Sequence, residues 1–302
     1  MKFAVMGAGE YGSKYGGFLV NAGLDVTFIA RGQRYEDIKR NGLSVQADPH
    51  GRTTNIDHVK VTDTPAEVGP VDVIVFAVKN YHLEEAAEQI KPLIRDDTVI
   101  LPLQNGVTAP ERIAAIVGRK HVLGYATSMP VQSISEWDGP VTPRIHKLWE
   151  VLNKTEVKVK IVDDIRIPLW EKVVNFAGGS PMMAARVDFG QANASREIRQ
   201  LVWEANEEAA AVARAEGIDL EPGVGDRMLA VLESYSQTNP RWRPSFLKDL
   251  DAGRRTELED LVGIIVHKGQ EHDVPTPVIR VCYMALKPYE MGTPPSIGKA
   301  QD

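Results

Sequence analysis

A glycine-rich loop directly after the first apolar segment constrains the fold of this chain more than any other feature. Residues 7–12 read Gly-Ala-Gly-Glu-Tyr-Gly and fit the pattern G-x-G-x-x-G. A strand is expected before the loop, over Lys2–Met6, a helix over Ser13–Ala22, and a second strand over Asp25–Ala30. This order is typical of the dinucleotide-binding βαβ unit. The alternative is a tight turn whose glycines hold no ligand.

Each glycine of the loop has its own physical role. The first permits a tight turn, the second lets the backbone approach a pyrophosphate, and the third lets helix and strand pack closely. The first turn of the helix supplies N–H donors for the anion. We therefore expect the pyrophosphate of a dinucleotide cofactor to bind at Gly7, Ala8, Gly9, Glu10, Tyr11 and Gly12.

The end of the second strand distinguishes the two nicotinamide cofactors. An NAD site usually places Asp or Glu there, which accepts a hydrogen bond from the ribose 2′-hydroxyl. This chain has Arg31 in that place and Arg34 close behind. A guanidinium suits a 2′-phosphate by charge and by bidentate geometry. The sequence thus favours NADP(H), with an ordinary exposed loop arginine as the alternative.

Strand-like and helix-like segments alternate through the first half of the chain. Helices are expected to begin near Gly12, Tyr35, Leu83 and Ala109. Further strands are predicted over Leu43–Gln46, Val71–Ala77, Thr98–Pro102 and Val122–Ala126, with a later pair near Arg144–Ile145 and Val157–Val162 that could close the sheet. Such alternation indicates a mostly parallel sheet covered by helices on both faces.

The pattern becomes helical from Leu169 onward, where no strand is predicted. A helix is expected over Glu197–Glu216, ended by Gly217, and another over Thr256–Gln270, whose apolar residues recur at helical spacing. A chain of 302 residues is long for a single core. We expect a Rossmann-type α/β domain over residues 1–165 and an all-helical domain over residues 166–302.

Composition excludes several classes of partner and site. A net charge of −6 argues against nucleic acid or an anionic membrane as partner, and the apolar runs are too short to span a bilayer. The seven histidines form no metal-binding pattern, so no metal is expected. The single Cys282 rules out an internal disulfide. With no signal peptide evident at the N-terminus, a cytoplasmic location is expected.

Motifs in both halves resemble the ketopantoate reductase family (2-dehydropantoate 2-reductases), over nearly the whole chain. The most specific is Arg254-Arg255-Thr256-Glu257, at its distance from Ser245. The other matching stretches are Gly7–Gly12 with Arg31, Ala77–Lys79, Leu103–Val107, Leu169–Lys172 and Gly269–Pro277. The resemblance implies NADPH-dependent reduction of a 2-keto acid, in the first place ketopantoate to pantoate in pantothenate biosynthesis. It also implies a helical domain like the C-terminal domain of 6-phosphogluconate dehydrogenase.

The resemblance assigns the catalytic pair to Lys172 and Glu257. An ammonium at Lys172 could protonate the alkoxide that develops during ketone reduction. Glu257 would hold that ammonium charged, and the family also places it at the cofactor. Ser245 is the family serine that binds the substrate carboxylate. The alternatives are a surface lysine over Trp170, a solvated helix face for Glu257 and a helix N-cap for Ser245.

The resemblance places further polar residues around the cofactor and substrate. Lys79 is expected near the cofactor, and Asn105 near both the nicotinamide ribose and the substrate, with a loop lysine and a turn asparagine as the alternatives. Asn175 and Ser180 are candidate substrate-binding residues. Gly178 and Gly179 could admit a ligand closely or serve helix packing.

Ser245 and Glu257 can share one site only if the chain bends between them. Twelve residues on a straight helix span about 18 Å, more than a small keto acid. A bend is therefore predicted around Asp251–Gly253. Thr256–Glu259 reads as a capping box that would restart the helix.

Three positions depart from the family pattern, because Phe176, Ser180 and Trp242 stand where the family often has asparagine. Phe176 and Trp242 would make the substrate pocket more apolar. A paralogue that reduces a different, more apolar 2-keto acid is therefore the first alternative function. A non-catalytic NADP(H)-binding redox sensor is the second. Apolar helices of the second half could also form a homodimer.

Overall fold

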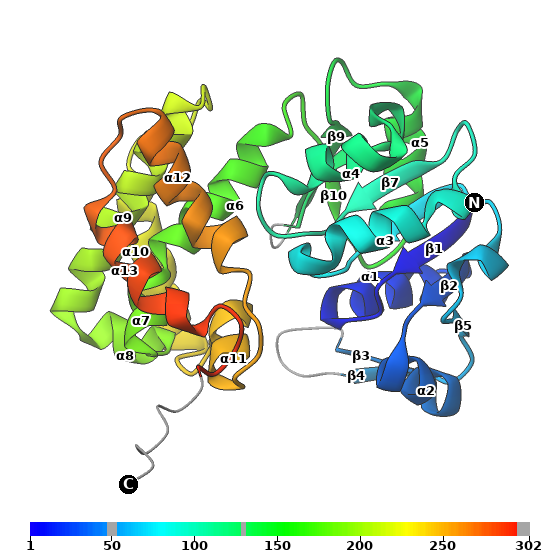
Figure 1. The fold of residues 1–302 in the computed structure, drawn as a ribbon, viewed down its shortest axis with the longest axis horizontal. Coiled ribbons are helices and arrows are strands. Elements are labelled where there is room, and N and C mark those ends of the chain that lie inside the picture. Colours follow the sequence, from blue (N-terminus) through cyan, green and yellow to red (C-terminus); the bar gives the residue numbers. More distant parts are fainter. Residues whose placement is uncertain (47–52, 128–130, 295–302) are drawn as a thin grey trace, which may run out of the picture. The chain divides into compact units, whose positions relative to one another are not determined.

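The computed structural model describes residues 1–46, 53–127 and 131–294, which divide into two compact units, Met1–Leu169 and Trp170–Asp302 (Figure 1). The first unit contains a five-stranded sheet with the strand order β5-β2-β1-β6-β7. All its neighbouring strands are parallel. The bounds are β1 Lys2–Met6, β2 Asp25–Ile29, β5 Lys60–Thr62, β6 Val73–Phe76 and β7 Val99–Pro102. The predicted parallel sheet is confirmed.

Helices cover both faces of this sheet. They are α1 Glu10–Asn21, α2 Gly32–Asn41, α3 Leu83–Gln89 and α4 Ala109–Val117, with short 3₁₀ turns η1 Pro65–Val68, η2 Asn80–His82, η3 Lys91–Leu93 and η4 Arg119–His121. Alternate residues of β1 enter two separate cores. Phe3 and Val5 pack with α1, whereas Ala4 and Met6 pack with α3 and α4. This two-faced burial explains why the strands read as continuous apolar runs.

Three parts of the first unit differ from the predicted pattern. β3 (Leu43–Gln46) pairs antiparallel with an unpredicted β4 (Thr53–Ile56), outside the main sheet. β8 (Leu123–Ala126), β9 (Gln132–Glu136) and β10 (Val159–Ile161) form a separate sheet of order β10-β9-β8. The strand predicted near Arg144–Ile145 is wrong, because these residues lie in helix α5 (Pro143–Leu152). Pro143 in the first turn favours a helix start, and Ile145, Leu148 and Leu152 are buried at helical spacing.

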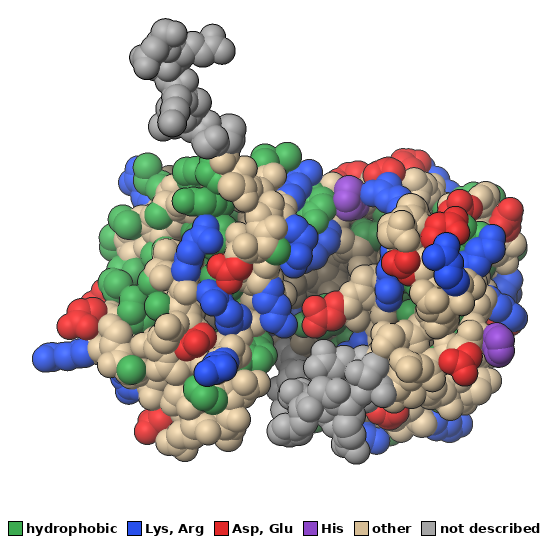
Figure 2. All heavy atoms as spheres, turned by 90° about the horizontal axis from the view of Figure 1, so that it is seen from below, with side chains coloured by type: hydrophobic (Ala, Val, Ile, Leu, Met, Phe, Trp, Pro, Cys, Tyr) green, Lys and Arg blue, Asp and Glu red, His purple; other side chains and the backbone are tan. Residues whose placement is uncertain are grey.

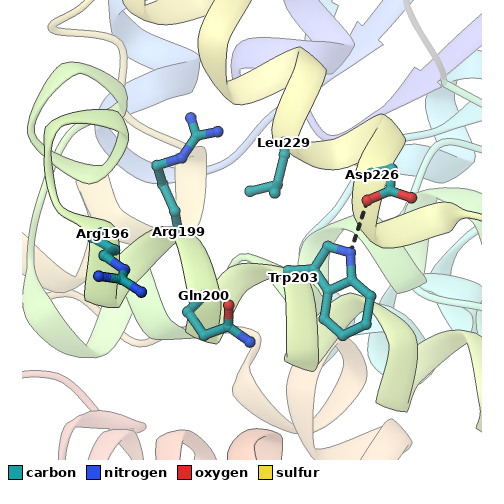
Figure 3. A pocket seen from close by; sticks show the side chains of 6 residues that line it. All are labelled: Arg196, Arg199, Gln200, Trp203, Asp226 and Leu229. Carbon is teal, nitrogen blue, oxygen red and sulfur yellow. Dashed lines mark hydrogen bonds between the residues drawn. The ribbon is translucent and has the colours of Figure 1, made fainter.

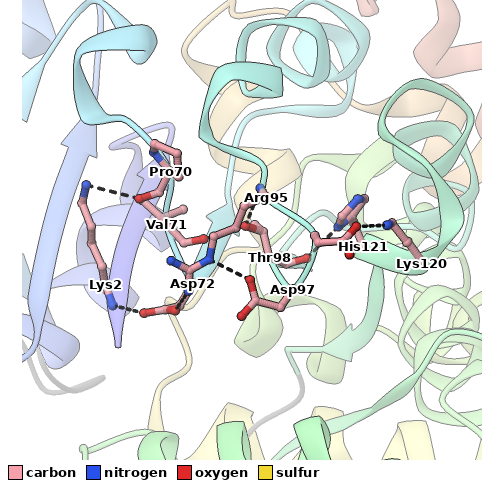
Figure 4. A network of polar contacts seen from close by, with 10 residues as sticks. Lys2, Pro70, Val71, Asp72, Arg95, Asp97, Thr98, Lys120 and His121 are labelled. Carbon is pink, nitrogen blue, oxygen red and sulfur yellow. Dashed lines mark hydrogen bonds and ion pairs between the residues drawn. The ribbon is translucent and has the colours of Figure 1, made fainter.

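Polar contacts tie together the amino ends of β1, β6 and β7 (Figure 4). The Lys2 backbone N–H donates to Asp72, which also pairs with Arg95. Thr98 Oγ1 donates to the carbonyl of Val71 at 2.6 Å, and His121 Nδ1 lies 2.8 Å from the carbonyl of Thr98. These side chains therefore serve the fold, and the candidate site residues of the first unit lie at the opposite, carboxyl edge of the sheet.

The second unit is helical, and from Val162 onward the described residues contain no strand. The bounds are α6 Arg166–Gly178, α7 Ser180–Ala185, α8 Phe189–Ala194, α9 Arg196–Ala215, α10 Val224–Thr238, α11 Ser245–Asp251, a π turn η5 Glu259–Gly263, α12 Ile264–Glu271, α13 Pro277–Leu286 and η6 Lys287–Tyr289. The helix predicted over Glu197–Glu216 is confirmed as α9. The expected Rossmann-type domain followed by a helical domain is confirmed.

The outer surface carries charges of both signs. On the face shown in Figure 2, acidic and basic side chains are intermixed over the two units. None of the helices formed by the described residues has the length and apolar character needed to cross a bilayer.

Candidate functional site

The glycine loop joins β1 to α1 in a geometry that only glycine allows at two positions. Gly7 has φ +95°, in the left-handed region. A Cβ on Gly12 would lie 1.9 Å from the carbonyl oxygen of Gly7. A Cβ on Gly9, in contrast, would meet no atom within 4 Å. The loop therefore leaves open space at its second glycine, beside the N-terminus of α1, and fits a pyrophosphate there.

The close approach of α1 to the sheet also depends on Gly16, which motif reasoning did not single out. A Cβ there would lie 2.4 Å from the Phe28 ring on β2. Gly16 is one helical turn after Gly12, so the two lie on the same face of α1. The sequence does not reveal this role of Gly16, because it depends on the Phe28 ring facing α1.

Two single substitutions should separate the fold from the binding function of the loop. Gly12→Ala is expected to lower the free energy of unfolding by about 1–3 kcal/mol or more, because the methyl group overlaps Gly7. Gly9→Ala should leave that free energy within about 0.5 kcal/mol of wild type. It should nevertheless weaken dinucleotide binding about tenfold, since the methyl fills the open space. Denaturant unfolding and cofactor titration measure the two effects. Undiminished binding by Gly9→Ala would contradict this placement of the pyrophosphate.

Arg34 stabilises the glycine loop by direct hydrogen bonds. Its Nε donates to the Ala8 carbonyl at 2.8 Å and its Nη2 to Ser13 Oγ at 2.8 Å. Ser13 Oγ in turn donates to the same Ala8 carbonyl at 2.9 Å. Arg34 therefore acts as a positioning residue, a role that its place beyond the second strand did not reveal.

Arg31 lies two positions after the end of β2, at the N-cap of α2. Its Nη1 donates to Glu85 Oε1 at 2.8 Å, and its Nη2 lies 3.2 Å from His82 Nδ1. The guanidinium is largely exposed to solvent. It is thus available at the carboxyl edge of the sheet, where ligands of this fold bind.

The loops after β6 and β7 are held together by two buried amides that sequence reasoning missed. Asn80 Nδ2 donates to the carbonyl of Asn105 at 2.8 Å. Gln104 Nε2 donates to the carbonyls of Val78 at 2.9 Å and Phe76 at 3.1 Å. These bonds bring the loops that carry Lys79 and Asn105 to one edge of the sheet.

In the second unit, Lys172 of α6 and Glu257 are brought together. The Glu257 side chain is buried, with 6% of the residue exposed, and Lys172 is half-buried. Burial lowers the pKa of Lys172 from its usual value of 10.5 to about 8, while the charge of Glu257 acts in the opposite direction. A lysine in this state can exchange a proton near neutral pH.

The bend that a shared site requires is present. Helix α11 ends at Asp251, Gly253 follows with φ +64°, and helical structure resumes only at Leu258. The predicted start of that helix at Thr256 is two residues early.

The predicted capping box is wrong. The Thr256 backbone N–H donates to the Glu290 carbonyl at 2.9 Å, and its hydroxyl makes no hydrogen bond. The Glu259 carboxylate instead binds the Tyr283 hydroxyl at 2.8 Å and the Lys287 ammonium. Long-range contacts of Glu259 thus replace the local cap.

Two of the substrate-binding candidates in the helical unit, Asn175 and Ser245, lie on the contacting helices α6 and α11, whereas Ser180 is buried at the start of α7. Phe176 meets Phe246 edge to face with ring centroids 6.2 Å apart, so α6 touches α11 one residue after Ser245. Ser245 is the first residue of α11, and the N-cap is Pro244, without a side-chain cap. Asn175 is exposed on α6. Ser180 is fully buried, its hydroxyl close to the Cys282 thiol, and so is not grouped with these residues.

Trp242 and Gly178 have structural explanations. The Trp242 ring packs against Phe189 and Tyr235, with centroids 4.8 and 5.5 Å away. A Cβ on Gly178 would lie 2.2 Å from the side chain of Asn206 on α9. Helix packing therefore explains Gly178, and the core of the helical unit explains Trp242.

A surface hollow of about 380 Å³ lies over α9 and α10 (Figure 3). Arg196, Arg199, Gln200, Trp203, Asp226 and Leu229 line it, and none of them is a candidate site residue. Within the described ranges no group of His, Cys, Asp or Glu could hold a metal ion.

Comparison with known proteins decides the family. The family model described as ketopantoate reductase PanE/ApbA matches residues 3–141, and its C-terminal counterpart matches residues 164–290. The chain belongs to the ketopantoate reductase family. As such it is an oxidoreductase that acts on a CH–OH group or the corresponding ketone.

Similar proteins align with nearly the whole length of this member of the ketopantoate reductase family. The uncharacterized oxidoreductase YkpB of Bacillus subtilis is 29% identical over 96% of this chain and 99% of its own length. A 2-dehydropantoate 2-reductase of Archaeoglobus fulgidus is 29% identical over 95% and 97%. The crystal structure of 2-dehydropantoate 2-reductase from Geobacter metallireducens superposes with a TM-score of 0.85, at 26% identity, over 95% and 99%. D-mandelate dehydrogenase, solved with NADH and anilino(oxo)acetate, shares the fold at 23% identity and a TM-score of 0.83, over 96% and 98%.

Proposed function

We propose that this protein reduces a 2-keto acid with NADPH, and that ketopantoate is its first candidate substrate. The observation that carries the proposal is the half-buried Lys172, whose pKa burial lowers to about 8 beside the buried carboxylate of Glu257. The relatives named 2-dehydropantoate 2-reductase, from Nostoc and Archaeoglobus among others, support the same reaction.

Each residue has a defined part in this reaction. When bound, the nicotinamide would supply the hydride that the carbonyl carbon receives. Lys172 donates its proton to the carbonyl oxygen, so that a hydroxyl replaces the ketone and the lysine leaves the step neutral. Glu257 favours the charged ammonium that begins the step. Ser245, at the start of α11, binds the substrate carboxylate with its hydroxyl.

The cofactor preference follows from the residue at the N-cap of α2, two positions after the end of β2. An arginine stands there, not an acidic residue, and its guanidinium is exposed at the carboxyl edge of the sheet. Arg31 would pair with a 2′-phosphate. Asn80 and Gln104 hold together the loops that carry Lys79 and Asn105. These two residues would contact parts of the cofactor other than the 2′-phosphate.

A second candidate substrate is a bulkier, more apolar 2-keto acid. Phe176 follows Lys172 by one helical turn and packs edge to face on Phe246. An aromatic surface there favours an apolar side chain on the substrate. It also lacks the amide that would bind a substrate hydroxyl, and an unpaired buried hydroxyl costs about 1–3 kcal/mol.

A substrate panel tests the proposal. NADPH oxidation is measured with ketopantoate and with branched and aromatic 2-keto acids, and repeated with NADH. We expect kcat/KM with NADPH to exceed that with NADH at least tenfold, and ketopantoate to be turned over best. A more apolar acid turning over better would select the second candidate. Absence of turnover with every 2-keto acid would contradict the proposal.

Three further expectations stay predictions. A dimeric ketopantoate reductase from Staphylococcus aureus shares the fold at 21% identity over 96% of this chain and 99% of its own, with a TM-score of 0.79. A homodimer of the present chain is consistent with its exposed α13 side chains Val281 and Met284. The cytoplasmic location and the domain boundary at residue 165 are likewise predictions.

A further inference from the structure

We propose that Glu85 sets the cofactor discrimination of this protein by competing with a 2′-phosphate for Arg31. The inference rests on the proposed NADPH site and goes beyond it, because it assigns a role to an acidic residue outside the family motifs. The contact that carries it is the 2.8 Å ion pair between Arg31 Nη1 and Glu85 Oε1.

The topology of the sheet places this pair next to the dinucleotide loop. Arg31 follows β2, and Glu85 lies in the first turn of α3, after β6. Both strands flank β1, and the glycine loop leaves the end of β1 between them. A 2′-phosphate bound to Arg31 would therefore lie beside the carboxylate of Glu85.

Gln89 on the same helix and His82 at its N-cap contact Glu85. Gln89 Nε2 donates to Glu85 Oε1 at 3.2 Å, and His82 Nδ1 lies 3.7 Å from Glu85 Oε2. His82 also lies 3.2 Å from Arg31 Nη2. These contacts keep the carboxylate close to any group that binds Arg31.

The exposure of the pair makes it displaceable. The side chains of Arg31 and Glu85 are 60% and 52% exposed, and ion pairs so exposed are weak. A phosphate dianion can take the place of Glu85 on the guanidinium. The displaced carboxylate remains nearby and repels the phosphate, whereas the uncharged 2′-hydroxyl of NADH meets no such repulsion. Glu85 therefore lowers the preference for NADPH over NADH.

Glu84 provides a matched control. It precedes Glu85 in the first turn of α3, has a similarly exposed side chain, and pairs with Arg112 at 2.7 Å. Glu84→Gln removes one negative charge from the same helix without touching Arg31. A general change in surface charge would therefore affect both variants alike.

The experiment compares the dissociation constants of NADPH and NADH for the full-length protein and three variants. Glu85→Gln should bind NADPH about three- to tenfold more tightly and NADH within twofold of wild type. Glu84→Gln should change neither more than twofold. Arg31→Gln should weaken NADPH binding about tenfold or more.

The outcomes separate the inference from the proposal beneath it. If Arg31→Gln weakens NADPH binding but Glu85→Gln does not strengthen it, the competition is overturned and the NADPH site stands. If Glu84→Gln strengthens NADPH binding as much as Glu85→Gln, the effect is general charge and the inference is overturned. If Arg31→Gln leaves NADPH binding unchanged, the proposed 2′-phosphate site itself fails.

Discussion

Replacement of Lys172 by alanine is expected to lower kcat for 2-keto acid reduction about a thousandfold. The substitution removes both the proton donor and the positive charge that stabilises the developing alkoxide. NADPH binding should stay within about twofold of wild type, because the residues proposed to hold the cofactor's phosphates lie in the Rossmann-type unit. Steady-state kinetics and a cofactor titration measure the two quantities. Lys172→Arg should be nearly as inactive, since a guanidinium does not give up its proton near neutral pH.

Two comparisons make this result interpretable. Lys158→Ala removes an exposed lysine outside the site and should retain full activity. The second comparison is with the alternative function, a redox sensor that binds NADP(H) without catalysis and would keep its cofactor binding and signalling without Lys172. Turnover by Lys172→Ala within tenfold of wild type would therefore exclude Lys172 as general acid.

Glu257→Gln is expected to lower kcat about ten- to a hundredfold at pH 8 and to move the pH profile. The carboxylate raises the pKa of Lys172 against the effect of burial, so its removal lowers that pKa further below 8. Reduction needs the charged ammonium, which exists below the pKa and is lost as pH rises through it. The descending limb of kcat should thus move to lower pH, and activity should recover partly in acid.

Glu259→Gln is the matched control for this variant. Glu259 lies two residues further along and binds Tyr283 and Lys287. Its replacement should leave the descending limb in place. An unshifted limb in Glu257→Gln would show that its charge does not act on Lys172.

The strands β1, β2, β6 and β7 of the parallel sheet were predicted well because a local pattern, a short and mostly apolar run, marks each of them. The strands of the parallel sheet are buried on both faces, and their apolar runs show it. β9 was missed because it reads Gln-Ser-Ile-Ser-Glu and is nevertheless fully buried, so neither hydrophobicity nor alternation marks it. Ile145 was misassigned because its helix depends on Pro143 and on burial of one face.

The candidate site shows the same division. Motifs and the family resemblance named Gly12, Arg31, Lys172 and Glu257 as candidates. The bend at Gly253 followed from the spacing of Ser245 and Glu257, which the resemblance placed in one site. The supporting residues escaped notice because their roles are long-range. Asn80 bonds a carbonyl 25 residues away, and the partner of Glu85 is 54 residues away. No local pattern encodes such contacts.

The rate of hydride transfer in a single turnover, followed from pH 6 to pH 10, tests the central claim most directly. The claim is that Lys172, with its pKa lowered to about 8, donates the proton to the reduced ketone. Reduction of the preferred 2-keto acid should be fast below pH 8 and fall about tenfold per pH unit above it. Oxidation of the product hydroxy acid should rise through the same pH, because it needs the neutral amine. A reduction rate that stays constant to pH 10 would contradict the account.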